Sequence, residues 1–562
     1  MSFALPRRFK GLLPVFMYLS TLIAAQSCLN TSTAINGTAF PPLIEATTED
    51  LVRGLESGLF TSVDLVQAYT ARILEVNSSL HMVTQLNPDA ISIAAQLDSQ
   101  RARGNVFGPL HGIPILIKNN IATADGMDNT AGSYSLAGAK VPRDSTIAAK
   151  LRKAGAVILG KTNLSQWANY RSFNTSNGWS AIAGQTFGAY YPGQDPSGSS
   201  SGSGVSSSLG LALAALGTET DGSILSPSEV NNLVGIKPTV GLTARDLVIP
   251  ISEHQDTIGP MARTVKDAAY LLAAIAGKSP YDNYTDAIPF DNIPDYVAAC
   301  NFSALSGKRI GVPRNLLDLS HDSTAAPIVT AFNTALDVLR SAGAVIIDNT
   351  NFTGYDALNK GNYSNIVLEA DFVSDLPKYL SQLSYNPNQV YNLDDVLNFT
   401  QTFPLEDWPE RDTLVWESAL ELGFDNTSPE FWSNYTMNTY LAGPLGVTGA
   451  LANYSLDALV LPTEFSPNFP ALIGTPVVTV PLGAYPVDTK VKLNTFGNLN
   501  ATAPNIPFGF SFLGPHFSEE LLIGLAYAFE QRTLVRNSIT PYIEPTVELV
   551  DVVNARLRRA SV

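Results

Sequence analysis

Apolar residues at helical spacing alternate with short apolar runs along the first third of the chain. The helical spacing occurs in 61–76, 89–104 and 145–154, which predicts three helices. The runs 112–118 and 155–161 are rich in isoleucine, leucine and valine and are bounded by turn residues, which predicts two strands. Alternation of strands and helices in this order is typical of an α/β sheet.

One long segment departs from this pattern. Between about residues 352 and 440 the chain becomes polar and aromatic, and its periodicity is weak. We interpret it as a variable insertion that faces the substrate or the surface. No internal repeat and no break in composition marks a second domain, so the sequence predicts one large domain over 45–555.

The N-terminus has the pattern of an export signal. Arg7, Arg8 and Lys10 precede the apolar run 11–25, and small residues follow it. The run is short for a membrane span and contains a proline, which favours a cleaved signal peptide over an uncleaved anchor. We therefore predict a signal peptide at 1–27, a loose mature N-terminus at 28–44, no membrane span after cleavage and a secreted, extracellular protein of the eukaryotic secretory pathway.

The composition fits a large folded protein of this kind. The 562 residues are 45% hydrophobic and 15% charged, so the chain can bury a large core. A net charge of −16 argues against nucleic acid as a partner. Two cysteines, Cys28 and Cys300, allow either one disulfide or two free thiols.

The density of N-x-S/T sequons supports export into a glycosylating pathway. Their asparagines are Asn30, Asn36, Asn77, Asn163, Asn174, Asn283, Asn301, Asn351, Asn362, Asn398, Asn426, Asn434, Asn453 and Asn500. Some of them are expected to be buried and unmodified.

Two short motifs suggest chemistry that their surroundings do not favour. "GAVILGKT" at 155–162 fits the phosphate-loop pattern, but its interior is apolar and predicts a buried strand. "GSSSG" at 198–202 fits the nucleophile elbow of a Ser-His-Asp esterase with Ser200 at its centre. An elbow needs a strand leading into the serine, whereas "YYPGQDP" precedes it and reads as a turn. The esterase hypothesis is weakened but stays open, with His254, His321 and His516 downstream.

A metal site has little support, because the five histidines show no ligand spacing and no C-x-x-C occurs. The stretch "DPSGSSSGSGVSSSLG" at 195–210 also differs from a flexible linker, because it continues into buried-looking sequence. Small residues in such a position indicate backbone packed closely, often near a ligand or a catalytic group.

Several motifs in order carry a resemblance to one family. They are "GPLHGIPILIKNNI", "TAGSYSLAG", "AGAVILGKTNLSQWAN", "SGSSSGSG", "ALGTETDGSILSPSEVNNLVGIKPTVGL", "QDTIGPMARTVKDAA", "LDALVLPT", "GTPVVTVPLG" and "FGFSFLGPHFSEELLIGLAYAFEQ". With them the chain resembles the amidase signature family of serine hydrolases over about residues 45–535. The resemblance implies a single α/β/α sandwich around a large mixed, mostly parallel sheet, and neither a cofactor nor a metal.

The resemblance also implies a catalytic triad of Ser223, Ser199 and Lys118. Ser223 is the implied nucleophile, Ser199 follows a cis peptide bond and relays protons, and Lys118 is the base. Lysine acts as a base only when it is neutral, and burial next to apolar residues lowers its pKa. Ser200 is a supporting residue of the same network, and the backbone N–H groups of Thr220, Asp221, Gly222 and Ser223 are the implied oxyanion hole.

Four positions depart from the common family pattern. Asn119 and Gln166 stand where many members have acids, and Asp221 replaces a glycine. Leu225 stands where many members have an arginine that some use to hold a substrate carboxylate, which argues against small anionic substrates. The "TETDGSI" form is similar to that of peptide amidases, so a C-terminal peptide amide or a small organic amide is the expected substrate. Fatty-acid or aryl amides are the alternative, and a catalytically inactive secreted glycoprotein is the alternative of another class.

Overall fold

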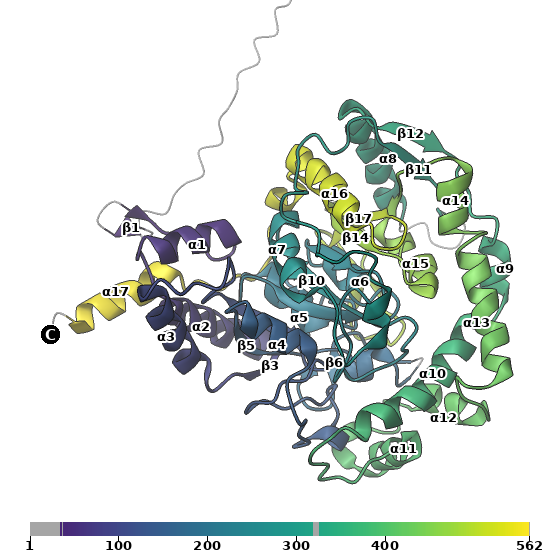
Figure 1. The fold of residues 1–562 in the computed structure, drawn as a ribbon, viewed down its shortest axis with the longest axis horizontal. Helices are drawn as coiled ribbons and strands as arrows, with labels where there is room; N and C mark the ends of the chain where they lie inside the picture. Colours follow the sequence, from purple (N-terminus) through teal and green to yellow (C-terminus); the bar gives the residue numbers. More distant parts are fainter. Residues whose placement is uncertain (1–33, 36–37, 173, 318–324, 561–562) are drawn as a thin grey trace, which may run out of the picture.

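The computed structural model describes residues 34–35, 38–172, 174–317 and 325–560. At its centre lies a sheet of eleven strands (Figure 1). In spatial order they are β12 (Val345–Asp348), β11 (Arg309–Val312), β13 (Ala458–Pro462), β17 (Pro507–Leu513), β14 (Val477–Ala484), β9 (Val234–Lys237), β10 (Thr257–Ala262), β8 (Ala215–Glu219), β4 (Pro114–Lys118), β5 (Val157–Thr162) and β3 (Val83–Leu86). Short antiparallel pairs outside this sheet are β1 (Ala34–Ile35) with β2 (Thr38–Ala39), β6 (Trp179–Ser180) with β7 (Gly184–Gln185), and β15 (Lys492–Leu493) with β16 (Asn500–Thr502).

Strand directions make this a mixed sheet, as expected. Parallel pairing is confined to two blocks, β12-β11-β13 and β8-β4-β5. β17 lies between β13 and β14, and β10 lies between β8 and β9, each antiparallel to both neighbours. β14 with β9 and β3 with β5 are also antiparallel. Antiparallel pairs therefore outnumber parallel ones, which corrects the expectation of a mostly parallel sheet, because β10 and β17 separate strands of like direction.

Helices cover both faces of the sheet, which confirms the α/β/α architecture. On β13, Leu459 and Leu461 pack in one cluster with Leu225, whereas Val460 packs in another with Phe332 and Leu522. The helices are α1 (Thr48–Glu56), α2 (Ser62–Leu80), α3 (Ala90–Ala102), α4 (Thr146–Lys153), α5 (Ser201–Ser208), α6 (Leu225–Glu229), α7 (Val265–Ile275), α8 (Ala326–Ser341), α9 (Tyr355–Lys360), α10 (Tyr363–Leu380), α11 (Leu393–Thr402), α12 (Leu414–Glu421), α13 (Pro429–Ala442), α14 (Val447–Asn453), α15 (Asn468–Ile473), α16 (Glu519–Thr533) and α17 (Leu549–Ala560).

The N-terminal elements lie where the apolar pattern predicts them. Helix α2 begins after Thr61, whose hydroxyl accepts a hydrogen bond from Asp64 N, while the Asp64 carboxylate accepts one from Thr61 N. This capping box satisfies two backbone donors at the helix start. The run 155–162 contains β5, an interior strand in which every residue is buried, so it forms no phosphate loop.

The expected insertion is mostly helical and forms an arc of helices, green at the right of Figure 1. Helix α10 packs on two different partners within it. Phe372 and Leu376 join a cluster with Trp416, whereas Val367 and Ala370 join one with Phe431. Burial on two sides spreads apolar residues around the helix, which explains why the sequence shows only weak periodicity here.

The N-terminal predictions fall mostly outside the described residues. The predicted signal peptide at 1–27 and Cys28 lie there, so the choice between a Cys28–Cys300 disulfide and two free thiols stays open. Cys300 is half-buried. Within the expected loose N-terminus, β1 and β2 pair. None of the helices in the described ranges is both long and apolar enough to cross a bilayer.

Candidate functional site

Lys118 is the last residue of β4, a strand whose five residues are all buried. Its Nζ lies 2.7 Å from Ser199 Oγ and 3.0 Å from Ser200 Oγ. Thr218, on the neighbouring strand β8, supplies two more contacts, with Oγ1 at 2.9 Å and the carbonyl oxygen at 3.1 Å. The structure thus brings the predicted base into direct contact with the predicted relay serine.

Burial sets the protonation of this lysine. Lys118 is 0% exposed, and desolvation lowers its pKa from 10.5 to about 7. The charges of Asp256 and Glu219 act in the opposite direction but do not offset the burial. Because a large share of the amine is neutral near pH 7, Lys118 can accept a proton there.

The surrounding hydrogen bonds separate the roles of Ser199 and Ser200. Ser200 Oγ donates to Thr218 O at 3.1 Å and accepts from Thr218 N at 3.3 Å, so its own proton is already committed. Towards a neutral Lys118 it can only accept. Ser199 Oγ has no hydrogen-bond partner besides Lys118 in the described ranges, so its proton is free to enter the lone pair of the amine. The Gly198–Ser199 peptide bond is cis, as the sequence resemblance implies.

Ser223 stands in a tight turn between β8 and α6. The turn passes through Gly222 at φ +78°, a left-handed conformation that favours glycine, and Ser226 N donates to Gly222 O to close it. Ser200 N donates to Ser223 O at 3.2 Å, which ties the turn to the serine-rich loop. Ser223 is 8% exposed while Ser199 and Lys118 are 0% exposed, so of the three predicted triad residues Ser223 alone reaches the surface.

The Ser223 and Ser199 hydroxyls are not hydrogen-bonded to each other within the described chain. Of the two hydrogen bonds that the proton relay needs, the one between Ser199 and Lys118 is therefore formed. The one between Ser223 and Ser199 is not formed in this structure. Catalytic hydrogen bonds are often long in a free enzyme and shorten when substrate binds.

Glu219 is a site residue that sequence reasoning missed. Its buried carboxylate accepts hydrogen bonds from Ile224 N at 2.7 Å and Leu225 N at 3.0 Å, immediately after Ser223. Burial raises the pKa of Glu219, and these N–H groups together with Gly222 N–H lower it. A carboxylate at the start of α6 thereby holds the turn. Only its position four residues before the serine could have indicated this.

The backbone of the turn offers donors for an oxyanion. The N–H groups of Thr220, Asp221 and Ser223 donate to no group within the described residues. The fourth predicted donor, Gly222 N–H, points instead to the Glu219 carboxylate and lowers the pKa of that group. Unengaged backbone donors beside the nucleophile are the arrangement that an oxyanion hole requires.

The nucleophile elbow around Ser200 is not formed. No strand leads into it, because residues 195–199 are loop and helix α5 begins at Ser201. Ser200 is fully buried and contacts none of the histidines in the described ranges. His321 lies outside those ranges. The geometry therefore gives no support to a Ser-His-Asp esterase.

The two amide side chains that replace family acids have specific partners. Asn119 Oδ1 accepts from Thr130 N and Oγ1 at 2.8 Å each, while its Nδ2 donates to Thr84 Oγ1 at 3.0 Å. An aspartate could not make the donated bond. Gln166 Nε2 donates to Glu406 Oε2 at 2.6 Å, and Glu406 also pairs with Arg171 at 3.2 Å. Because Glu406 belongs to the insertion, this buried group ties the insertion to the core.

Leu225 is fully buried among apolar residues that include Leu461 and Phe469. A leucine here offers no positive charge to a substrate carboxylate.

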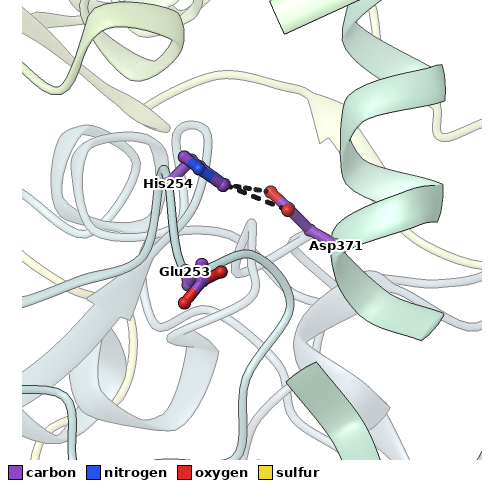
Figure 2. Close-up of side chains that lie close together, drawn as sticks. All are labelled: Glu253, His254 and Asp371. Carbon is purple, nitrogen blue, oxygen red and sulfur yellow. Dashed lines mark hydrogen bonds and ion pairs between the residues drawn. The ribbon is translucent and has the colours of Figure 1, made fainter. Parts of the chain in front are cut away.

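Glu253, His254 and Asp371 gather ligand-type atoms within 4.8 Å of one another (Figure 2). The hydrogen bonds of these residues argue against a metal-binding site. Asp371 accepts from Ser252 Oγ at 2.5 Å, from His254 Nδ1 at 3.0 Å and from Asn426 Nδ2 at 3.0 Å. Protein donors thus occupy the carboxylate, and the cluster is an internal hydrogen-bonded contact between the core and the insertion.

In sequence and fold, the chain is similar to known amidases. The family model described as Amidase matches residues 64–523. A protein from Arthroderma benhamiae that is named as an amidase is 52% identical over 530 residues, covering 91% of this chain and 89% of that protein.

Two solved structures are also similar. The native peptide amidase from Stenotrophomonas maltophilia shares 37% identity with a TM-score of 0.78, over 90% of this chain and 99% of that one. The peptide amidase PAM in complex with the competitive inhibitor chymostatin shares 37% identity with a TM-score of 0.79, over 88% of this chain and 99% of that one.

Proposed function

The chain belongs to the amidase signature family of amide-hydrolysing enzymes, and on this premise we propose that it is a secreted amidohydrolase whose nucleophile is Ser223. Ser199 relays protons and Lys118 is the base. The observation that carries this proposal is the contact between Ser199 Oγ and a fully buried Lys118 whose pKa is about 7.

The first half of the reaction follows from these contacts. Neutral Lys118 takes the Ser199 proton, Ser199 takes the Ser223 proton, and Ser223 Oγ forms a bond to the amide carbonyl carbon. The carbonyl oxygen becomes an oxyanion, which the N–H groups of Thr220, Asp221 and Ser223 can receive. Lys118 then returns the proton through Ser199 to the leaving nitrogen. The C–N bond breaks, and ammonia or an amine departs from the acyl-enzyme.

Water completes the reaction along the same relay. It loses a proton through Ser199 to Lys118 and attacks the acyl carbon. The ester bond to Ser223 Oγ breaks, and the proton returns to Ser223. A carboxylic acid is released and the starting protonation states are restored, so no cofactor is needed in this scheme.

We propose that the substrates are C-terminal peptide amides or small organic amides. The similarity to a peptide amidase over nearly the whole of both chains supports this choice, as does the apolar Leu225. Long-chain fatty or aryl amides are the second candidate, because an apolar residue at position 225 does not exclude them.

A mixed amide panel tests the substrate. We expect a peptide carboxamide to gain one dalton, the change from –NH₂ to –OH, while internal peptide bonds stay intact. Mass spectrometry of peptide, fatty and aryl amides incubated with wild type and with Ser223→Ala gives the measurement. Preference for fatty amides would overturn the peptide proposal, and conversion by Ser223→Ala would overturn the nucleophile.

We propose secretion and glycosylation on the basis of the N-terminal pattern and the sequons. Burial then distinguishes the sequons that can carry a glycan from those that cannot. Asn163 and Asn426 are buried, and both amides are hydrogen-bonded. A glycan there would break these bonds and find no room. Glycopeptide mass spectrometry of the secreted protein is expected to find both unmodified. Exposed asparagines that are expected to carry glycans are Asn174, Asn283, Asn301, Asn351, Asn362, Asn398 and Asn453. A glycan on Asn163, or none anywhere, would contradict the proposal.

A further inference from the structure

Residues 251–256, here called the linking segment, lie between the insertion and the oxyanion turn. The segment leads into β10, the neighbour of β8 in the sheet. One end of it is held by helix α10 of the insertion, and the other end holds Thr220. These two sets of contacts connect parts of the chain that are far apart in sequence.

On the insertion side, two buried carboxylates of α10 hold the segment. Asp371 accepts from Ser252 Oγ at 2.5 Å and from His254 Nδ1 at 3.0 Å, as Figure 2 shows for His254. Asp375 Oδ2, one helical turn later, accepts from Glu253 N at 2.7 Å. Carboxylates four residues apart lie on one face of a helix, so α10 holds the segment at two points.

Packing and a further amide restrict this contact. The His254 ring lies 4.7 Å from the Tyr435 ring and 5.2 Å from the Phe431 ring, between centroids, and both belong to α13. Asn426 Nδ2 donates to Asp371 and to Glu253, 3.0 Å in each case. The histidine is therefore fixed in one orientation by the insertion.

On the active-site side, the segment ends on Thr220. Asp256 Oδ1 accepts from Thr220 Oγ1 at 2.6 Å, and Gln255 Nε2 donates to Thr220 O at 3.3 Å. Asp256 Oδ2 accepts from Ile251 N and Ser252 N, at 2.8 and 3.2 Å, which closes the segment on itself. Both the side chain and the carbonyl of Thr220 are thus held, and this residue carries one of the backbone donors for the oxyanion.

We propose that Asp371 is a positioning residue for amide hydrolysis: through the linking segment it fixes Thr220 and thereby the geometry of the oxyanion turn. The inference rests on the proposed function, because it assigns the turn its role. A small displacement of such a donor weakens transition-state binding more than ground-state binding. We therefore expect the loss of Asp371 to lower kcat rather than to raise KM.

The test uses three single variants and one double variant of the full chain. Asp371→Asn weakens the hold on the segment, and Thr220→Val removes the Oγ1 bond to Asp256 while keeping the backbone N–H. Ser418→Ala is the matched control, because Ser418 Oγ donates at 2.7 Å to Glu369, also on α10, without contacting the linking segment. The double variant combines Asp371→Asn with Thr220→Val.

We expect Asp371→Asn and Thr220→Val each to lower kcat on a dipeptide carboxamide by about tenfold to hundredfold, with KM nearly unchanged. The double variant is expected to lose little more than the worse single variant, because both act through one route. Ser418→Ala is expected to keep wild-type kcat. Thermal melting of each variant shows whether it is folded.

Multiplicative losses in the double variant, or a folded Asp371→Asn with wild-type kcat, would overturn the proposal. If Asp371→Asn does not fold, a wild-type kcat in Thr220→Val overturns it alone. A wild type that is inactive on every amide of the mixed panel would instead contradict amide hydrolysis itself, so the two failures are distinguishable.

Discussion

Replacement of Ser223 by alanine is expected to lower kcat for amide hydrolysis by on the order of 10⁴- to 10⁶-fold, because no other group can form the acyl-enzyme. The substitution removes only Oγ. The Ser223 carbonyl still accepts from Ser200 N, and the Glu219 carboxylate still holds the following N–H groups. Binding of substrate should therefore survive. Steady-state kinetics and intact mass after a fluorophosphonate probe measure the two losses, of turnover and of labelling.

A serine in α6, the helix that follows the Ser223 turn, provides the control. Ser228 Oγ donates to Ile224 O at 2.7 Å, and Ser228→Ala removes this hydroxyl one turn away from the site. It is expected to keep activity and probe labelling. Retained activity in Ser223→Ala together with its loss in Ser200→Ala would instead point to Ser200 as nucleophile.

Local patterns predicted the elements that build the site. The apolar run that ends at Lys118 became β4, and the helix expected over 61–76 became α2, because capping and periodicity are properties of neighbouring residues. The pairing of Lys118 with Ser199 needed the family resemblance, since 81 residues separate them.

Contacts between distant segments were beyond sequence reasoning. Asp371 and Glu406 lie in a stretch with weak periodicity, and nothing near them indicates that one meets His254 and the other Arg171. Glu219 was missed for a related reason, because its role depends on the chain turning back onto it. Buried carboxylates are informative only once their partners are known.

The pH dependence of turnover is the second large effect, because the relay requires neutral Lys118. Its pKa is about 7, so protonation below that pH blocks the relay. We expect log(kcat/KM) to rise with unit slope up to about pH 7 and then to level off. The Asp256 charge raises this pKa, so Asp256→Asn is expected to move the midpoint of the pH profile to lower pH. This shift is separate from any fall in kcat that the substitution causes. A midpoint near the ordinary lysine value would contradict the assignment.

Lys118→Met is expected to abolish turnover without unfolding the protein, and it should also change how the stability of the protein depends on pH. Folding lowers the pKa of Lys118, so between about pH 7 and 10.5 the unfolded chain binds one more proton than the folded chain. Wild type therefore gains stability as pH rises through this window. Below about pH 7 the folded protein bears the full free-energy cost of burying a charged Lys118. The Tm advantage of Lys118→Met over wild type should accordingly be larger near pH 6 than near pH 9. A Tm advantage that does not change with pH would show that folding does not lower the pKa of Lys118. That result would contradict the assignment of Lys118 as a neutral base.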